Sequence, residues 1–182
     1  MSGRGFAREV GADVSRDWNP SQATLDLTRK EHGWPDDLSQ EEIVGNIFSQ
    51  WTSSSGDPLS RMVMSGGLKE AGLSTENLTL PMTWLKDHPG YLKDYEDMGR
   101  VIYNKTQSYF EQRGIEGVHL FRRASSTGER VYSSWSSSYG AFVTSDANLL
   151  FIEKDIPVRF IFSIPETGFG NIIEDEVVVF HR

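Results

Sequence analysis

The sequence predicts an α+β protein in which a helical N-terminal half packs on a β-rich C-terminal half. Between residues 36 and 114, apolar residues recur at three- and four-residue spacing, as on one face of a helix. From residue 115 onward, short runs of β-branched and aromatic residues alternate with turn sequences, which is typical of strands. Because the helices are too few to close a core of their own, we predict one domain over residues 36–182, preceded by a polar N-terminal arm over residues 1–35.

The first predicted helix has a recognisable start. Ser39 and Glu42 form an S-x-x-E capping box, in which each side chain satisfies a backbone N–H of the other residue. A core-facing stripe follows at Ile43, Ile47, Phe48 and Trp51. The longest helix signal covers residues 92–114 and ends at Gly114, a residue suited to a helix C-terminus.

Two shorter segments lie between these helices. Asp57 and Pro58 predict a helix start, with the aspartate as the cap and the proline in the first turn. We expect Gly66 and Gly67 to interrupt this helix, and we expect residues 79–91 to be a short helix or a loop.

The β-rich half contains alternating or apolar runs bounded by turn residues. The predicted strands cover residues 117–123, 130–137, 148–152, 158–164 and 175–180. The intervening residues 153–157 and 165–171 are predicted turns.

Composition limits the possible functions. The chain of 182 residues has no cysteine, which excludes a disulfide framework and a cysteine nucleophile. No two of the four histidines are three or four residues apart, so we expect no metal site. The net charge of −8 argues against a general nucleic-acid binder, and no apolar run is long enough to span a membrane. The N-terminus lacks the apolar core of a signal peptide.

Three carboxylates, Glu174, Asp175 and Glu176, stand directly before an apolar run at residues 177–180. If all three belong to the strand, alternation puts Glu174 and Glu176 on one face and Asp175 on the other. Like charges on one face repel, and a buried carboxylate needs a partner. The segment is therefore either a solvated strand end or a catalytic pair.

Other polar groups of the β-rich half complete a recognisable order. Arg122 follows Phe121 at the end of the first predicted strand, and Ser134-Trp135-Ser136 forms an S-x-S motif in the second. Together with Glu174-x-Glu176, this order resembles the mono-ADP-ribosyltransferase superfamily of the R-S-E type, including bacterial toxin effectors and phage-encoded transferases. The resemblance covers roughly residues 100–182 and implies a split β-sandwich ADP-ribosyltransferase core.

The resemblance implies a set of roles, with NAD⁺ as the substrate and no metal. Glu176 stabilises the oxocarbenium-like ribose, and Glu174 orients an acceptor arginine. Arg122 grips the NAD⁺ phosphates or ribose, and Ser134 hydrogen-bonds Glu176 or the ribose and so fixes the position of the carboxylate. Further cofactor-binding positions are Trp135 and Ser136, with Phe142 or Tyr139 stacking on nicotinamide.

Phe169 resembles the aromatic residue of the turn that recognises the target.

Two alternatives stay open. Strand register decides whether Arg122 or its neighbour Arg123 faces the site, and Ser136-Ser137-Ser138 also fits the serine motif.

The resulting hypothesis is an enzyme that transfers ADP-ribose to a target protein, on an arginine, in the cytoplasm of a target or host cell. Delivery by secretion or injection stays open, as does a cognate immunity protein. The alternatives are an NAD⁺ glycohydrolase or nucleic-acid ADP-ribosyltransferase of the same fold, and a non-catalytic interaction or virion domain.

Overall fold

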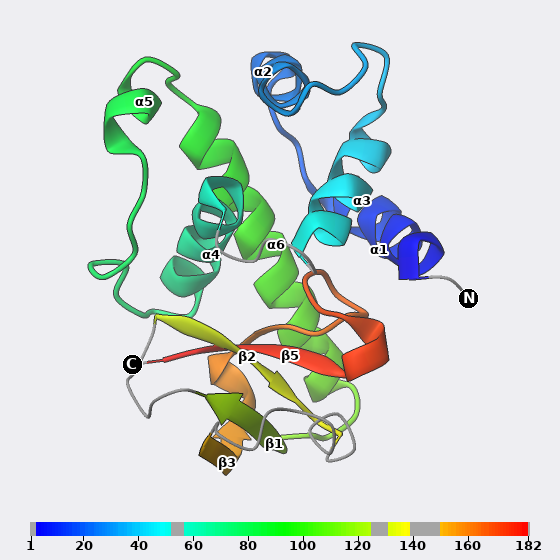
Figure 1. Cartoon of the computed structure of the whole chain (residues 1–182), viewed down its shortest axis with the longest axis vertical. Coiled ribbons are helices and arrows are strands. Elements are labelled where there is room, and N and C mark those ends of the chain that lie inside the picture. Colours follow the sequence, from blue (N-terminus) through cyan, green and yellow to red (C-terminus); the bar gives the residue numbers. More distant parts are fainter. Residues whose placement is uncertain (1–2, 52–56, 125–130, 139–149, 182) are drawn as a thin grey trace.

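A computed structural model describes residues 3–51, 57–124, 131–138 and 150–181. The described helices are α1 (Gly3–Asp17), α2 (Gln22–His32), α3 (Gln40–Trp51), α4 (Pro58–Glu70), α5 (Met82–Lys86) and α6 (Tyr91–Glu111). The described strands are β1 (Gly117–Ala124), β2 (Tyr132–Ser136), β3 (Leu150–Pro157), β4 (Ile161–Ser163) and β5 (Glu176–Phe180). Figure 1 shows α1 to α5 above the strands and α6 running down past β2 and β5. Six helices and a sheet in one chain confirm the predicted α+β class for the described residues.

The five strands form one sheet in the order β3-β1-β2-β5-β4, and every described pairing is antiparallel. Strand β5 is buried on both faces. Val178 and Phe180 belong to the large core of the helical half, whereas Val177 and Val179 belong to a second cluster closed by Phe110 of α6. The sheet therefore separates two apolar clusters, and β5 contributes to both.

The predicted polar arm over residues 1–35 is wrong, because α1 and α2 are part of the fold. Val10, Val14 and Trp18 of this segment are buried, and α1 packs so closely on α3 that a Cβ at Gly11 would lie 2.7 Å from the Gly45 nitrogen. The Trp18 indole N–H donates to the backbone oxygen of Asp94 at 2.6 Å. These contacts tie the first helices to α3 and α6.

The predicted helix starts are confirmed. The backbone N–H of Ser39 donates to the Glu42 carboxylate at 2.9 Å, and the Glu42 N–H donates to the Ser39 hydroxyl at 3.2 Å. The Asp57 carboxylate accepts from the Ser60 N–H at 2.7 Å, with Pro58 in the first turn of α4. Local capping chemistry therefore fixed both helix starts.

The predicted interruption at Gly66 and Gly67 is wrong, since α4 continues to Glu70. The glycines instead permit a close crossing of α4 and α6. A Cβ at Gly66 would lie 1.8 Å from the Glu96 carbonyl oxygen, and one at Gly99 would lie 1.8 Å from the Val63 carbonyl oxygen. The absence of side chains on both helices allows their backbones to touch.

Two strand boundaries also differ from prediction. Residues 153–157 are not a turn but the second half of β3, which pairs with β1 from Gly117↔Pro157 to Ala124↔Leu150. Residues 158–160 form a 3₁₀ turn, and only Ile161–Ser163 of the predicted fourth strand pair with β5. Pairing with β1 extended a segment whose charged residues had indicated a turn.

The close crossing of α4 and α6 predicts that a glycine-to-alanine substitution there destabilises the protein. Gly99→Ala should lower the free energy of unfolding by about 3 kcal/mol through overpacking, although glycine-to-alanine changes in open helices usually stabilise by about 1 kcal/mol. Gly72→Ala is the control, because φ is +71° there and nothing lies within 4 Å of the added Cβ. It should cost only about 1–2 kcal/mol. Urea unfolding measures both, and a neutral or stabilising Gly99→Ala contradicts the close crossing.

Candidate active site

Glu176 is a nearly buried carboxylate at the first residue of β5. Its side chain lies between the sheet and α3, and the residue is 8% exposed. Oε1 accepts a hydrogen bond from the Trp51 indole N–H at 3.2 Å, and Oε2 accepts one from the Asn171 backbone N–H at 2.7 Å. These two donors compensate the desolvation of the charged form, which is otherwise costly.

Two serines of β2 share the face of Glu176. Ser136 pairs directly with Glu176, and Ser134 pairs with Val178 two residues along. The Ser136 hydroxyl donates to the backbone oxygen of Glu174 at 2.6 Å and accepts from the Ser138 N–H at 3.0 Å. Ser136 thus fixes the backbone on the N-terminal side of Glu176, while Ser134 is exposed on the same face.

Trp135 lies on the opposite face of the sheet. It pairs with Val177, is buried in the second apolar cluster, and donates its indole N–H to the Ser133 hydroxyl at 2.8 Å. The structure therefore separates Trp135 from the face of Glu176, and the predicted contact of Trp135 with NAD⁺ does not fit this geometry.

Register decides between the two arginines. Phe121 of β1 pairs with Ser136 of β2, so alternation puts Arg123 on the face of Ser134 and Ser136. Arg122 lies on the other face, where its guanidinium carbon is 6.0 Å from the centroid of the Trp135 ring. Of the two alternatives left open by the sequence, the structure brings Arg123, and not Arg122, to the face of Glu176.

Glu174 is not part of the strand, so the predicted alternation of the three carboxylates is wrong. It ends a 3₁₀ turn, Ile172–Glu174, and its side chain is exposed. Asp175 follows with φ of +46°, in the left-handed region, directly before β5 begins. The two glutamates therefore differ in environment, since Glu176 is enclosed and Glu174 faces solvent.

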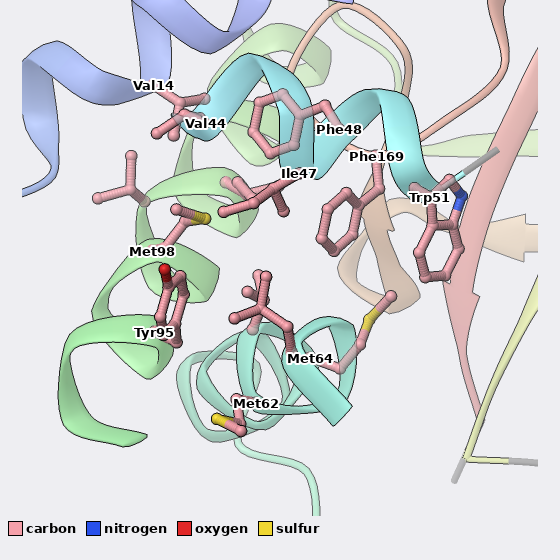
Figure 2. Close-up of a cluster of buried hydrophobic side chains, with 14 of the residues drawn as sticks. Val14, Val44, Ile47, Phe48, Trp51, Met62, Met64, Tyr95, Met98 and Phe169 are labelled. Carbon is pink, nitrogen blue, oxygen red and sulfur yellow. The ribbon is translucent and has the colours of Figure 1, made fainter. Parts of the chain in front are cut away.

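Phe169 is fully buried, contrary to its predicted role in contacting a target protein. Its ring stacks on Trp51 with centroids 4.7 Å apart and an interplanar angle of 6°. Figure 2 shows the two side chains next to each other. It also meets the Phe48 ring edge-on at 5.4 Å. The flanking Gly168 and Gly170 allow this close packing, because a Cβ at Gly168 would lie 2.8 Å from Ile102 and Gly170 has φ of +151°.

Sequence reasoning missed two donors to Glu176. Trp51 was correctly predicted to be a core residue, but nothing local indicates that its N–H reaches a residue 125 positions away. The Asn171 donor is a backbone group and has no side-chain signal. The one usable signal was that a buried tryptophan usually requires an acceptor for its N–H.

The same sheet face continues from β1 onto β3. The Arg123 guanidinium carbon lies 5.4 Å from the centroid of Phe151, and Phe121 stacks on Phe151 at 6.1 Å. Further along, His119 Nδ1 lies 2.6 Å from an Asp155 carboxylate oxygen, and this hydrogen bond raises the pKa of His119 above its usual value. Phe142 and Tyr139, the candidates for stacking on nicotinamide, lie outside the described residues.

A separate open groove of about 590 Å³ lies between α1 and α6. Its lining includes Asp13, Asp17 and Lys105, and Lys105 is held by both aspartates at 3.3 and 2.7 Å. Of the predicted site residues that the structure describes, none lines it. In the described part of the chain, no three histidine or acidic side chains are grouped closely enough to hold a metal ion. Among the described helices, none combines the length and the apolar character needed to cross a bilayer.

Comparison with protein-family models, curated proteins and solved structures found no significant match.

The burial of Phe169 can be tested through stability. Phe169→Ala should lower the free energy of unfolding by about 3–5 kcal/mol, the usual cost of removing a buried aromatic ring. A surface recognition residue should change stability by less than about 0.5 kcal/mol. Chemical denaturation measures the loss of stability and so distinguishes a buried from a surface Phe169. Met82→Ala is the control for a surface residue, because Met82 is exposed.

Proposed function

We propose that this protein cleaves the nicotinamide–ribose bond of NAD⁺ and transfers ADP-ribose to an acceptor, a protein arginine. The observation that carries the proposal is the shared face of Glu176, Ser136, Ser134 and Arg123 on the adjacent strands β5, β2 and β1. These are the residue types of the R-S-E order, and register brings them together although they are far apart in sequence.

The chemistry requires a fixed negative charge. The C–N bond breaks with its electron pair leaving on neutral nicotinamide, and positive charge develops on the ribose. A carboxylate held in a poorly solvated position stabilises that charge more than it does in water. Glu176 suits this role because it is 8% exposed and held by two N–H donors.

The other residues divide the remaining tasks. Arg123 offers a planar guanidinium that matches phosphate oxygens, and Ser134 offers an exposed hydroxyl on the same face. Ser136 acts through the backbone of Glu174 rather than on the substrate. The exposed Glu174 carboxylate suits an acceptor that approaches from solvent and must lose a proton as its nitrogen bonds to the ribose.

The central prediction concerns Glu176. Glu176→Gln should reduce nicotinamide release from NAD⁺ by at least about 100-fold, because it removes the stabilising charge. Its amide can accept only one of the two N–H donors well, so we also expect a loss of about 1–3 kcal/mol in stability. Assays therefore use a temperature at which circular dichroism shows the variant folded. Parent-like turnover in folded Glu176→Gln contradicts the proposal.

Labelled NAD⁺ separates the possible products. Incubation with a cell lysate should transfer label to a discrete protein band in the parent and not in Glu176→Gln. Label appearing only as free ADP-ribose identifies a glycohydrolase, and label in nucleic acid identifies a different acceptor. No release of nicotinamide under any of these conditions overturns the enzymatic proposal in favour of a non-catalytic domain.

The two arginines provide an internal comparison. Arg123→Ala should raise the KM for NAD⁺ about tenfold or more, since hydrogen bonds to charged groups contribute roughly 1.5–3 kcal/mol. Arg122→Ala should change KM much less, because Arg122 lies on the face of Trp135. Steady-state kinetics measures both, and the reverse ranking shows that the register of β1 differs from the one described.

A further inference from the structure

We propose that Trp51 is a positioning residue whose indole N–H orients the Glu176 carboxylate. The catalytic consequence rests on the proposed function, whereas the contact itself can be tested without it. Trp51 is the last residue of α3, so the proposal assigns the helical half of the protein a direct part in the site.

The hydrogen bond from Trp51 uses one oxygen of the Glu176 carboxylate, and the carboxylate can still accept further hydrogen bonds. Trp51 donates to Oε1, and the Asn171 backbone donates to Oε2. The terminal torsion of glutamate is soft, so a single donor leaves the carboxylate plane poorly defined. Two donors from different segments of the chain fix the orientation of the carboxylate plane. Each oxygen has a second lone pair, which stays able to accept from a substrate hydroxyl.

The indole is itself held in place. Trp51 is 2% exposed, stacks on Phe169 with an interplanar angle of 6°, and lies 6.0 Å from the Tyr132 ring. Figure 2 shows Trp51 at the end of α3 with Phe169 beside it on the side of the other core side chains. Rotation of the indole away from Glu176 would break this stack. The N–H direction is therefore determined by packing before any substrate binds.

This packing gives the buried Phe169 an indirect role. It holds the face of Trp51, and the same loop carries Asn171, whose N–H reaches the other carboxylate oxygen. Gly170, with φ of +151°, lets the backbone pass between these two residues where a Cβ would lie 2.9 Å from the Glu176 carbonyl oxygen. Both hydrogen bonds to Glu176 thus depend on the position of the loop that carries Phe169 and Asn171.

The kinetic test replaces the donor and keeps the aromatic ring. Trp51→Phe should lower kcat for nicotinamide release about tenfold to a hundredfold, the range for a lost hydrogen bond to a charged group, and should change KM for NAD⁺ by less than about threefold. Trp18→Phe is the matched control, because Trp18 is also buried and donates its indole N–H, but to the Asp94 backbone. It should keep the parent kcat and KM.

The contact is also visible without turnover. The protein has five tryptophans, and the indole N–H signal of Trp51 in a ¹H–¹⁵N spectrum is the one missing in Trp51→Phe. It should shift in Glu176→Gln, while the Trp18 signal should stay in place. If Trp51→Phe fails to fold, the signals are assigned in the parent by through-bond and through-space correlations, and the comparison with Glu176→Gln still applies.

The outcomes separate the two proposals. An active parent with inactive Glu176→Gln but parent-like kcat in Trp51→Phe overturns the role of Trp51 and leaves the proposed function standing. An unshifted Trp51 signal in Glu176→Gln also overturns it. A parent without turnover overturns the proposed function, and the orientation of Glu176 by Trp51 is then decided by the indole signal alone.

Discussion

The enclosure of one carboxylate governs the arrangement of this protein. Burying Glu176 is unfavourable unless its charge is satisfied, and the two N–H groups that satisfy it come from α3 and from the loop before β5. The Asn171 donor lies only five residues before Glu176, whose own N–H donates to the Asn171 oxygen at 3.1 Å, whereas the Trp51 donor is 125 positions away. The fold must therefore hold a helix end, a glycine-flanked loop and a strand start together, and the stack of Trp51 on Phe169 joins the first two.

Packing within the helical half holds α3, and with it Trp51, in position. Glycines on α4 and α6 allow their backbones to touch, and those on α1 and α3 allow a similarly close approach. Close helix packing of this kind restricts rotation of α3, which carries Trp51 at its end. Phe162, Phe169, Val178 and Phe180 extend the same core across to the sheet. The helices thus do more than cover the sheet, since they fix the direction of a donor to Glu176.

Features with a local physical cause could be predicted from the sequence, and features that depend on distant partners could not. Capping at Ser39 and Asp57 needs only neighbouring residues, so both helix starts were predicted. Helix α2 was missed because its buried face is partly polar. Thr28 is fully buried and its hydroxyl bonds to Tyr95 at 2.5 Å, a contact with no hydrophobic period to reveal it. The orientation of Arg122 likewise depended on pairing with β2, which the sequence left open.

The unequal settings of the two glutamates follow from one backbone feature. If β5 began at Glu174, both carboxylates would share a buried face and repel each other. The left-handed Asp175 ends the 3₁₀ turn before the strand starts, so Glu176 enters the core while Glu174 stays in solvent. The Ser136 hydroxyl holds the Glu174 carbonyl at 2.6 Å and fixes that break from the neighbouring strand. A serine on β2 thereby helps to separate an enclosed carboxylate from an exposed one, and the proposed transfer between a bound donor and an approaching acceptor needs two carboxylates in such different environments.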